Sequence, residues 1–460
     1  MITEVERLAA FVSSTRWEHL TPEARKALRL RILDSLGCAV AALDSDVLRA
    51  VRGEVEELGG RPLCTLIGGG RTAPDRAALH NAAAVRYLDF NDSFMAPGET
   101  CHPSDNLGAV LAAVEFAGGD GRDLLVSLAV AYQVQCRLSE VAPVRARGFD
   151  HVTQGAYAAA AGAARGLGLD AAATANAVAI AGTAFNALRV TRTGTLSNWK
   201  GLAYPNTAFS AVHAAFLARA GITGPAGVFE GNKGFEDTIA GPFSIDWAGE
   251  DLEAVRRTSI KRFYAEFHSQ AVLEAVLELR QEAGIEGRQV ERVEVDVFQV
   301  AYDIIGGGEE GDKRDVRTKE EADHSLPYLV AVALFDGQVL PAQYAPDRIL
   351  RADVQDLLRR VDVRPAADLS ARFPAEHACR VRIELPGGRV LAREKSDYRG
   401  FLTRPAGWDD VEDKFRRLTV PVAGEAAAGR IVGLVRELER VRVDELCAAL
   451  ANVRRNHDDG

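Results

Sequence analysis

Apolar residues recur along much of this chain at the spacing of an α-helix. Ile32, Leu36 and Val40 follow one another at intervals of four residues, which places them on one face of a helix. Thr21 and Pro22 precede them. Threonine suits the N-cap because its hydroxyl accepts a backbone N–H, and proline suits the first helical position because an N–H there has no partner in the helix. The pattern predicts a helix that begins at Pro22.

Similar patterns continue through the first half of the chain. They predict helices over residues 74–87, 105–117, 122–141, 151–166, 170–187 and 203–219. Several of these segments, such as LLVSLAVAYQV and AAATANAVAIAGTAF, are apolar on nearly every side. Helices of that kind pack in the interior of a helical core. We therefore expect a large all-helical domain in this part of the chain.

The pattern changes after about residue 257. Val293, Val295 and Val297 alternate with polar residues, which is the period of a β-strand. The segment ACRVRIELPGGRVLAREKSDY reads as two strands joined by a Pro-Gly-Gly turn. Between these strands, SLPYLVAVALFDG and DVQDLLRRVDV have the apolar spacing of helices. This part of the chain is expected to form a smaller α+β domain.

Helical periodicity returns at GWDDVEDKFRRL. We therefore predict a mainly α fold with an α+β second domain. Residues 1–257 are expected to form the first part of an all-helical domain, residues 258–401 a smaller α+β lid domain, and residues 402–460 C-terminal helices that rejoin the helical domain.

The composition narrows the functional classes. The 460 residues carry a formal net charge of −10, whereas nucleic-acid-binding proteins present basic surfaces, so we expect no nucleic-acid partner. No stretch of 18 apolar residues is evident that would span a membrane. The N-terminus lacks the basic and apolar regions of a signal peptide. These features predict a cytoplasmic protein with no membrane partner.

Motifs for metals and cofactors are missing from the sequence. The six cysteines are scattered without C-x-x-C spacing, and no H-E-x-x-H or G-x-S-x-G motif occurs. The glycine-rich stretches IGGGRTAP and GPAGVFEGNKGFEDTIAG lack the spacing of nucleotide-binding loops. The sequence therefore predicts neither a bound metal nor a cofactor.

Titratable residues concentrate in YLDFNDSFMAPGETCHPSDN, residues 87–106. His102 comes just ahead of a predicted helix start, where Ser104 or Asp105 could cap the helix and its N-terminal amides could meet an anion. The same residue types also satisfy backbone groups in turns and caps that have no catalytic role. Taken alone, the segment could line an active site or could be a loop with only a structural role.

Four further polar clusters lie along the chain. They contain Asp150 and His151; Arg192 and Lys200; Lys261 and His268; and Asp323, His324 and Tyr328. Individually, His151 could be a helix cap, and Lys200 could be a solvated loop cation instead of a clamp for a carboxylate. Together, without metal-ligand spacing in any of them, the clusters favour metal-free acid–base chemistry on a carboxylate-rich substrate.

Five of these stretches, taken in order, resemble the MmgE/PrpD family. They are YLDFNDSF…HPSDNLGAVLA, SNWKGLAYPNTA, FEGNKGFED, KRFYAEFHSQ and ADHSLPYLVAVALFDG, and the resemblance extends to WDDVEDKFRRL near the C-terminus. The family contains 2-methylcitrate dehydratases, cis-aconitate decarboxylases and an iminodisuccinate epimerase. The resemblance implies a homodimer whose subunits each have a helical domain and an α+β lid domain, with a metal-free active site between the domains.

The resemblance also implies which residues form the site. The candidate catalytic residues are His102, Asp89, Lys200, Lys261, His151 and Tyr328, and the candidate substrate-binding residues are Ser93, His268 and Arg192. Ser93 lies where the decarboxylases tend to have threonine. The APGET insert and the spacing in AEFHSQ resemble the dehydratases more than the decarboxylases.

These features predict a metal-independent lyase that dehydrates 2-methylcitrate or citrate to the cis-aconitate-type product. His102 is the expected proton-transfer group, with Asp89 as its partner, and Lys200 and Lys261 are expected to bind substrate carboxylates. Which of the remaining site residues serves the leaving hydroxyl is left open. The alternatives are a decarboxylase or an epimerase of the same family and, more remotely, a non-catalytic dimeric binding protein.

Overall fold

The computed structural model describes residues 2–194 and 196–453, which divide into two compact units. The first unit comprises the described residues of Met1–Arg192, Asn198–Thr258 and Gly407–Gly460, and the second those of Thr193–Ser197 and Ser259–Ala406. The first unit is mainly helical and the second combines helices with a four-stranded sheet, which confirms the predicted fold class.

The first unit is built from long helices and two short strand pairs. Its helices are α1 (Glu4–Ser14), α2 (Pro22–Ala42), α3 (Asp46–Leu58), α4 (Pro74–Tyr87), α5 (Leu107–Ala117), α6 (Gly121–Val141), α7 (Val152–Gly166), α8 (Ala171–Ala184), α9 (Trp199–Arg219), α17 (Trp408–Arg436) and α18 (Val443–Ala451). Its strands are β1 (Cys64–Thr65), β2 (Arg71–Thr72), β3 (Phe94–Ala96) and β4 (Glu99–Cys101).

The start of α2 shows how the local sequence sets a helix boundary. The Thr21 side chain accepts the Ala24 N–H at 3.0 Å, and Pro22 occupies the first helical position. The predicted helix start at Pro22 is therefore confirmed.

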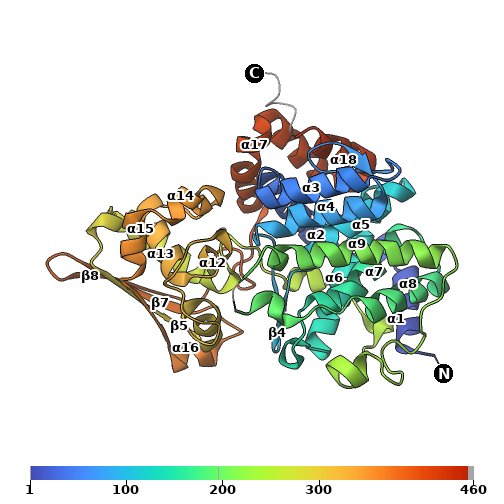
Figure 1. The fold of residues 1–460 in the computed structure, drawn as a ribbon, viewed down its shortest axis with the longest axis horizontal. Helices are drawn as coiled ribbons and strands as arrows, with labels where there is room; N and C mark the ends of the chain where they lie inside the picture. Colours follow the sequence, from blue (N-terminus) through green and yellow to red (C-terminus); the bar gives the residue numbers. More distant parts are fainter. Residues whose placement is uncertain (1, 195, 454–460) are drawn as a thin grey trace. The chain divides into compact units, whose positions relative to one another are not determined.

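Small residues let the central helices of this unit pack closely. α4 packs against α5 and α9, and α7 packs against α6, α8 and α9; Figure 1 shows α4, α5 and α9 running side by side. A Cβ atom at Gly108 on α5 would lie 2.4 Å from the backbone nitrogen of Ala82 on α4. Only glycine permits this approach, which brings the end of α4 close to the start of α5.

Helix α17 is long and apolar enough to cross a membrane by length and composition alone. In its most apolar 18-residue stretch, 39% of the residues are buried. The backbone at Gly424 is non-helical, with φ 77° and ψ 167°, so two shorter helices meet at a kink, and α17 packs against α2. A single helix that meets these criteria is weak evidence of a span, because helices in folded cores meet them as well.

The segment 87–106, predicted as a loop, contains a hairpin. Strands β3 and β4 pair in antiparallel fashion, with Ala96 opposite Glu99. Pro97 and Gly98 form the turn between them, and Gly98 has φ 76°, which glycine adopts without steric cost. Phe94 on β3 and Cys101 on β4 are both buried in one apolar cluster with Cys136. Burial of this apolar pair stabilises a hairpin that the polar sequence around it concealed.

The second unit contains one mixed sheet and shorter helices. Its strands are β5 (Arg292–Val297), β6 (Val361–Pro365), β7 (Cys379–Leu385) and β8 (Arg389–Lys395), in the order β6-β5-β7-β8. Its helices are α10 (Gln270–Ala283), α11 (Gln299–Ala301), α12 (Lys319–Ala322), α13 (Leu326–Asp336), α14 (Pro346–Ile349), α15 (Ala352–Leu358) and α16 (Ala367–Arg372).

Two predictions for this sheet are confirmed and one is wrong. The alternation at residues 293–297 is strand β5, and the Pro-Gly-Gly segment turns between β7 and β8, with Leu385 opposite Arg389. The segment DVQDLLRRVDV is only partly helical, because α15 ends at Leu358 and residues 361–365 form β6, parallel to β5. The partner strand lies about 70 residues earlier in the chain, so the local helical spacing did not reveal the pairing.

Candidate active site

The predicted site residues fall into two groups, one in each unit. The first unit contains Asp89, Ser93, His102, His151, Arg192 and Lys200, and the second contains Lys261, His268 and Tyr328. All are buried except Arg192, which is partly exposed. Lys200 lies in the first turn of α9 and is 4% exposed, so it is not a solvated loop cation.

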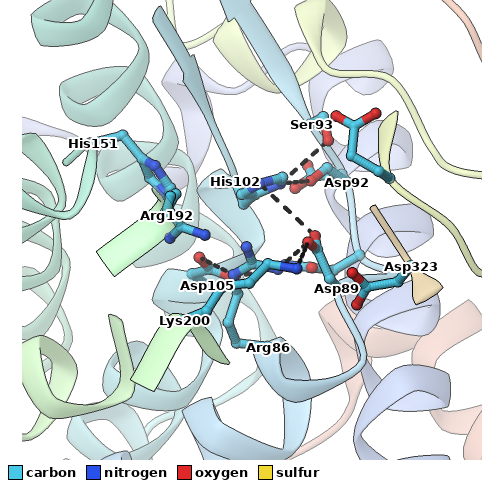
Figure 2. Close-up of polar contacts among 12 residues, drawn as sticks. Arg86, Asp89, Asp92, Ser93, His102, Asp105, His151, Arg192, Lys200 and Asp323 are labelled. Carbon is cyan, nitrogen blue, oxygen red and sulfur yellow. Dashed lines mark hydrogen bonds and ion pairs between the residues drawn. The ribbon is translucent and has the colours of Figure 1, made fainter. Parts of the chain in front are cut away.

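Asp89 lies at the centre of the first group. It follows the end of α4 with φ 54°, a left-handed conformation that aspartate tolerates better than most residues. Its Oδ1 accepts from Nη1 of Arg86 at 2.6 Å, and its Oδ2 lies 3.5 Å from Nζ of Lys200. Nε2 of His102 is 4.0 Å from Oδ1, and Figure 2 shows these three side chains converging on the carboxylate.

Arg86 connects Asp89 to a second buried carboxylate. Its Nε lies 3.4 Å from Oδ2 of Asp105, and the arginine is 1% exposed. Burial alone would lower the pKa of Arg86, but Asp89 and Asp105 outweigh it and raise that pKa above its usual value. Burial raises the pKa of Asp105 to about 7, although Arg86 and a hydrogen bond from Asn91 act in the opposite direction. Asp105 therefore titrates near neutral pH.

His102 is held in one tautomer. Its Nδ1 lies 2.8 Å from the backbone carbonyl oxygen of Asp92 and 3.2 Å from the hydroxyl of Ser93. A carbonyl oxygen only accepts hydrogen bonds, so Nδ1 carries a proton. The neutral ring then has its basic lone pair on Nε2, the nitrogen that faces Asp89. This is the arrangement that a general base requires.

The side chain of Asp92 shapes the backbone around His102. It accepts the Ser104 N–H at 3.1 Å, the Ser104 hydroxyl at 2.6 Å and the Tyr132 hydroxyl at 2.9 Å. Asp105 was a candidate helix cap, and this prediction is wrong, because its carboxylate bonds the Asn91 amide and faces Arg86. The N-cap residues of the 3₁₀ turn η2 (Pro103–Asn106) and of α5 are His102 and Asn106, and neither forms a capping bond through its side chain. Proline at position 103 starts that turn without a cap.

His151 lies next to His102 and has its own carboxylate partner. The two rings meet edge to face with centroids 5.4 Å apart. Nδ1 of His151 is 3.1 Å from Oδ1 of Asp150, whose Oδ2 accepts from Nε of Arg192 at 2.5 Å. Burial opposes ionisation of Asp150, but Arg192 and His151 lower its pKa well below the usual range.

The His151 ring is neutral at ordinary pH. Burial lowers the pKa of His151 to about 3, with Arg192 acting in the same direction and Asp150 against it. Its Nε2 and the Nη2 of Arg192 are both buried and find no hydrogen-bond partner among residues 2–194 and 196–453. Buried polar atoms normally have partners, so these two atoms are candidates for contact with a ligand.

In the second unit, we consider Lys261 and His268 together with Glu266 and His377. Lys261 is 1% exposed. Nδ1 of His268 lies 2.7 Å from Oε1 of Glu266, and the His268 ring stacks against that of His377 with centroids 5.8 Å apart. Burial lowers the pKa of His377 to about 3, and neither of its ring nitrogens has a hydrogen-bond partner in the described part of the chain.

Tyr328 donates its hydroxyl to a backbone carbonyl. The acceptor is Gln343, in the 3₁₀ turn η11 (Pro341–Tyr344), and Tyr328 is fully buried on α13. Burial raises the pKa of this phenol above its usual range. This environment is that of a packing residue, and the catalytic role of Tyr328 stays a prediction.

Several residues of the two groups were not identified from the sequence. Arg86, Asp150, Glu266 and His377 contact or orient the predicted residues, and only Asp150 was noted beforehand, as a cluster member. Glu266 stands two positions before His268, which was a usable signal. Within the described ranges, no group of three or more His, Cys, Asp or Glu side chains could hold a metal ion.

Comparison with known proteins identifies the family of the chain. Residues 6–248 match the MmgE/PrpD N-terminal domain and residues 263–440 match the MmgE/PrpD C-terminal domain. The 2-methylcitrate dehydratase of Escherichia coli (strain K12) is 29% identical over 360 residues, which cover 71% of this chain and 70% of the relative. That of Cupriavidus necator is 29% identical over 374 residues, with coverages of 75% and 74%. The cis-aconitate decarboxylase of Mus musculus is 24% identical over 474 residues, with coverages of 97% and 92%.

Proposed function

Because the chain belongs to the MmgE/PrpD family, we propose that it is a lyase that dehydrates a small tricarboxylate, 2-methylcitrate or citrate, to the cis-aconitate-type product. Relatives at 29% identity carry the name 2-methylcitrate dehydratase, which supports this reaction class. Three positive side chains of the first unit suit a substrate with several carboxylates: Arg86 and Lys200, which are buried, and Arg192, which is partly exposed.

One observation carries the proposal, namely the fixed tautomer of His102. The Asp92 carbonyl keeps a proton on Nδ1, so the neutral ring presents a basic Nε2 toward Asp89. A base held in this way can remove the weakly acidic proton next to a substrate carboxylate without first changing its tautomer. The imidazole also titrates near neutral pH in ordinary surroundings, where proton transfer is most effective.

In the proposed reaction, Nε2 of His102 takes the proton from the carbon next to a carboxylate. The electrons of the broken C–H bond form the new carbon–carbon double bond. The C–O bond of the neighbouring hydroxyl breaks, and its oxygen keeps that electron pair, takes up a proton and leaves as water. Negative charge develops on the carboxylate as the proton leaves, and Lys200 is the cation proposed to stabilise it. Asp89, held by Arg86 and Lys200, is proposed to stabilise the imidazolium that forms on His102.

The remaining predicted residues are proposed to bind the substrate. Nη2 of Arg192, which has no hydrogen-bond partner among the described residues, is proposed to bind a substrate carboxylate. Nε2 of His151, which likewise has none there, is proposed to bind a hydroxyl. Ser93 contacts His102 and is proposed to help orient it. Lys261 is proposed to bind a further carboxylate, and His268 is considered in the next subsection. No step is assigned to Tyr328, whose hydroxyl donates to the Gln343 carbonyl, and its catalytic role stays a prediction.

The chemistry proposed here involves only side chains and no metal. We expect turnover to survive exhaustive chelation, with no gain from added iron or zinc. Loss of activity on chelation that is restored by one metal ion would contradict this part of the proposal.

The decisive experiment compares four substrates. The purified protein is incubated with 2-methylcitrate, citrate, cis-aconitate and iminodisuccinate, and products are identified by ultraviolet absorbance of the enoate and by NMR. Appearance of an enoate from 2-methylcitrate or citrate would support dehydration. Turnover of none of the four would contradict the proposed function.

Decarboxylation of a cis-aconitate-type substrate is the second candidate. The Mus musculus decarboxylase aligns with 97% of this chain, more than the 71% covered by the Escherichia coli dehydratase. Carbon dioxide released from cis-aconitate would favour it, and inversion at carbon without other change would favour an epimerase. We also propose a homodimer in the cytoplasm, which light scattering and cell fractionation would test.

A further inference from the structure

The Glu266 carboxylate holds His268 through two hydrogen bonds. Oε1 accepts from the ring Nδ1 at 2.7 Å, and Oε2 accepts from the backbone N–H of His268 at 2.6 Å. Burial would raise the pKa of Glu266, but His268, His324 and Lys261 lower it to about 2, so the group is ionised at neutral pH. An ionised carboxylate has no proton to donate, so His268 must donate both bonds and its Nδ1 is protonated.

The other nitrogen of the His268 ring has no partner. His268 is 3% exposed, and its Nε2 makes no hydrogen bond to any residue that the structure describes. Leaving a buried polar atom unpaired is unfavourable, so buried polar atoms normally have a partner. A ring that is bonded at one nitrogen and unpaired at the other is ready to exchange a proton with a bound molecule through Nε2.

We propose that Glu266 is a positioning residue that holds His268 as the proton donor for the departing hydroxyl. This inference rests on the proposed function, because dehydration requires such a donor. The protonated ring gives the Nε2 proton to the hydroxyl oxygen as the C–O bond breaks, and the oxygen leaves as water with the electron pair of that bond. His268 is left neutral with its proton on Nδ1, the tautomer that Glu266 accepts from.

The charged surroundings of His268 agree with this role. Lys261 and His324 act on the Glu266 carboxylate together with His268, and His377 stacks on the His268 ring. Glu266 is thus a negative group in direct contact with a ring that must become positive before it can donate. An ionised partner at Nδ1 stabilises an imidazolium, as in hydrolase triads in which a carboxylate orients a histidine.

A simpler interpretation is that Glu266 only caps a turn. It is the N-cap of the 3₁₀ segment η8 (Phe267–Ser269), and its bond to the His268 N–H is the capping bond. Glu266→Asp separates the two roles. Aspartate is a good capping residue, but its side chain is one methylene shorter and does not reach Nδ1 from the capping position. Glu266→Gln tests the tautomer. The amide oxygen of glutamine can accept one of the two hydrogen bonds from His268, but its NH₂ group is a donor and cannot accept the other.

The first measurement reads the tautomer without using activity. Histidine-labelled protein is prepared as wild type, Glu266→Gln and His268→Asn, and ¹⁵N spectra are recorded at a pH where the ring is neutral; the His268→Asn spectrum assigns the signal. We expect wild-type His268 to carry its proton on Nδ1 and Glu266→Gln to shift the ring toward the Nε2–H form. An Nε2–H ring in the wild type, or an unchanged ring in Glu266→Gln, would overturn the proposal.

The second measurement is kinetic and uses the substrate that the wild type dehydrates. We expect kcat of Glu266→Asp to fall roughly 10–100-fold with little change in KM, as when the partner that orients a histidine is removed. His268→Asn should lose more, on the order of 10²–10⁴-fold, the scale of general acid catalysis. The matched control is Glu278→Gln on α10, which removes a carboxylate that pairs with Arg393 and Lys395 in the same unit.

The outcomes separate this inference from the proposed function. Full activity in Glu266→Asp would show that Glu266 is only a cap, and an equal loss in Glu278→Gln would show a general sensitivity to lost charge; either result overturns the inference. A wild type that dehydrates no carboxylate would refute the proposed function and the hydroxyl as proton acceptor. In that case the ¹⁵N spectra would still decide whether Glu266 fixes the ring.

Discussion

His102 in the first unit and His268 in the second are both fixed through Nδ1, but by different kinds of acceptor. The acceptor for His102 is the neutral backbone carbonyl of Asp92, and the acceptor for His268 is the ionised carboxylate of Glu266. A carbonyl selects a tautomer and adds no full charge, whereas a carboxylate selects the same tautomer and also favours the protonated ring.

This difference shows how one side-chain type can serve two opposite tasks. A base should be neutral before the reaction, and an acid should be protonated, so the two rings need different partners for the same nitrogen. The buried carboxylates follow the same logic. Burial raises the pKa of Asp105 to about 7, whereas three cationic or histidine neighbours hold the pKa of Glu266 near 2.

Removing His102, the proposed base, should have the largest effect. We expect His102→Ala to lower kcat by roughly 10²–10⁴-fold, the range for loss of a general base. The matched control is His213→Ala, because that side chain is 56% exposed. Steady-state kinetics on folded protein, checked by circular dichroism, gives the answer. Near-normal turnover in His102→Ala would show that His102 is not the base. The proposed difference in role between His102 and His268 would then be wrong.

Removing the cation beside Asp89 should come next. Lys200→Met keeps the length of the side chain but removes its charge, and we expect kcat to fall on the order of 10²–10³-fold because a preorganised group that stabilises developing charge is lost. Lys26→Met, at an exposed position on α2, is the control. Rapid kinetics that show a change in KM alone would mean that Lys200 binds the substrate equally in the ground and transition states.

The titration of Asp105 should appear in the stability of the first unit. Its folded-state pKa of about 7 exceeds the usual 3.8, so the folded state binds this proton more tightly. The contribution is present at low pH and is lost as the pH rises through about 7. Between pH 5 and 8 it should lower the free energy of unfolding by about 3 kcal/mol. Asp105→Asn, which resembles the protonated form, should lack that loss.

Tryptophan fluorescence suits this measurement, because Trp17, Trp199, Trp247 and Trp408 all belong to the first unit. Chemical denaturation of the wild type and Asp105→Asn at pH 5 and pH 8 gives the four free energies required. The same pH dependence in both proteins would assign the effect to another group.

The smallest effect is expected at His377 in the second unit, and its sign is opposite. The pKa is lowered to about 3 from the usual 6.5, so only the unfolded state takes up the proton between these values. This stability is present above pH 6.5 and is lost as the pH falls. His377→Phe should avoid a loss of about 2 kcal/mol between pH 7 and pH 5. Hydrogen exchange in peptides of residues 259–406 would measure this change in the free energy of unfolding. At pH 8 the His377 ring is neutral in the folded and the unfolded state, so that pH serves as the reference for both proteins.

The sequence predicted the helices well because their signals are local. Thr21 and Pro22 set the start of α2, and the predicted segments 74–87 and 122–141 match α4 (Pro74–Tyr87) and α6 (Gly121–Val141) closely. Strand β6 was missed because its pairing with β5 is a long-range contact. The hairpin of β3 and β4 was missed because its two buried residues, Phe94 and Cys101, are set among polar ones.

For the candidate site, the sequence suggested candidate residues but not the partners that surround them. His102 and Lys200 stood out by residue type and by family resemblance. Their electrostatic partners did not, because Arg86 lies inside a helix and Asp92 acts on His102 through its backbone carbonyl, which no sequence pattern encodes. The raised pKa of Asp105 depends on complete burial, which appears only when the helices pack.

The left-handed backbone of Asp89 has an evolutionary consequence. Glycine and asparagine adopt this conformation at least as readily as aspartate, so the backbone does not select for the carboxylate. Arg86 is what favours a carboxylate at position 89. Without Asp89, its fully buried guanidinium would face one carboxylate in place of two. If Asp89 acts in the reaction as proposed, selection for folding and selection for chemistry act on the same pair. In duplicated copies released from catalysis, Arg86 and Asp89 should be lost together, and such paired losses would mark descendants that have kept the fold and abandoned the reaction.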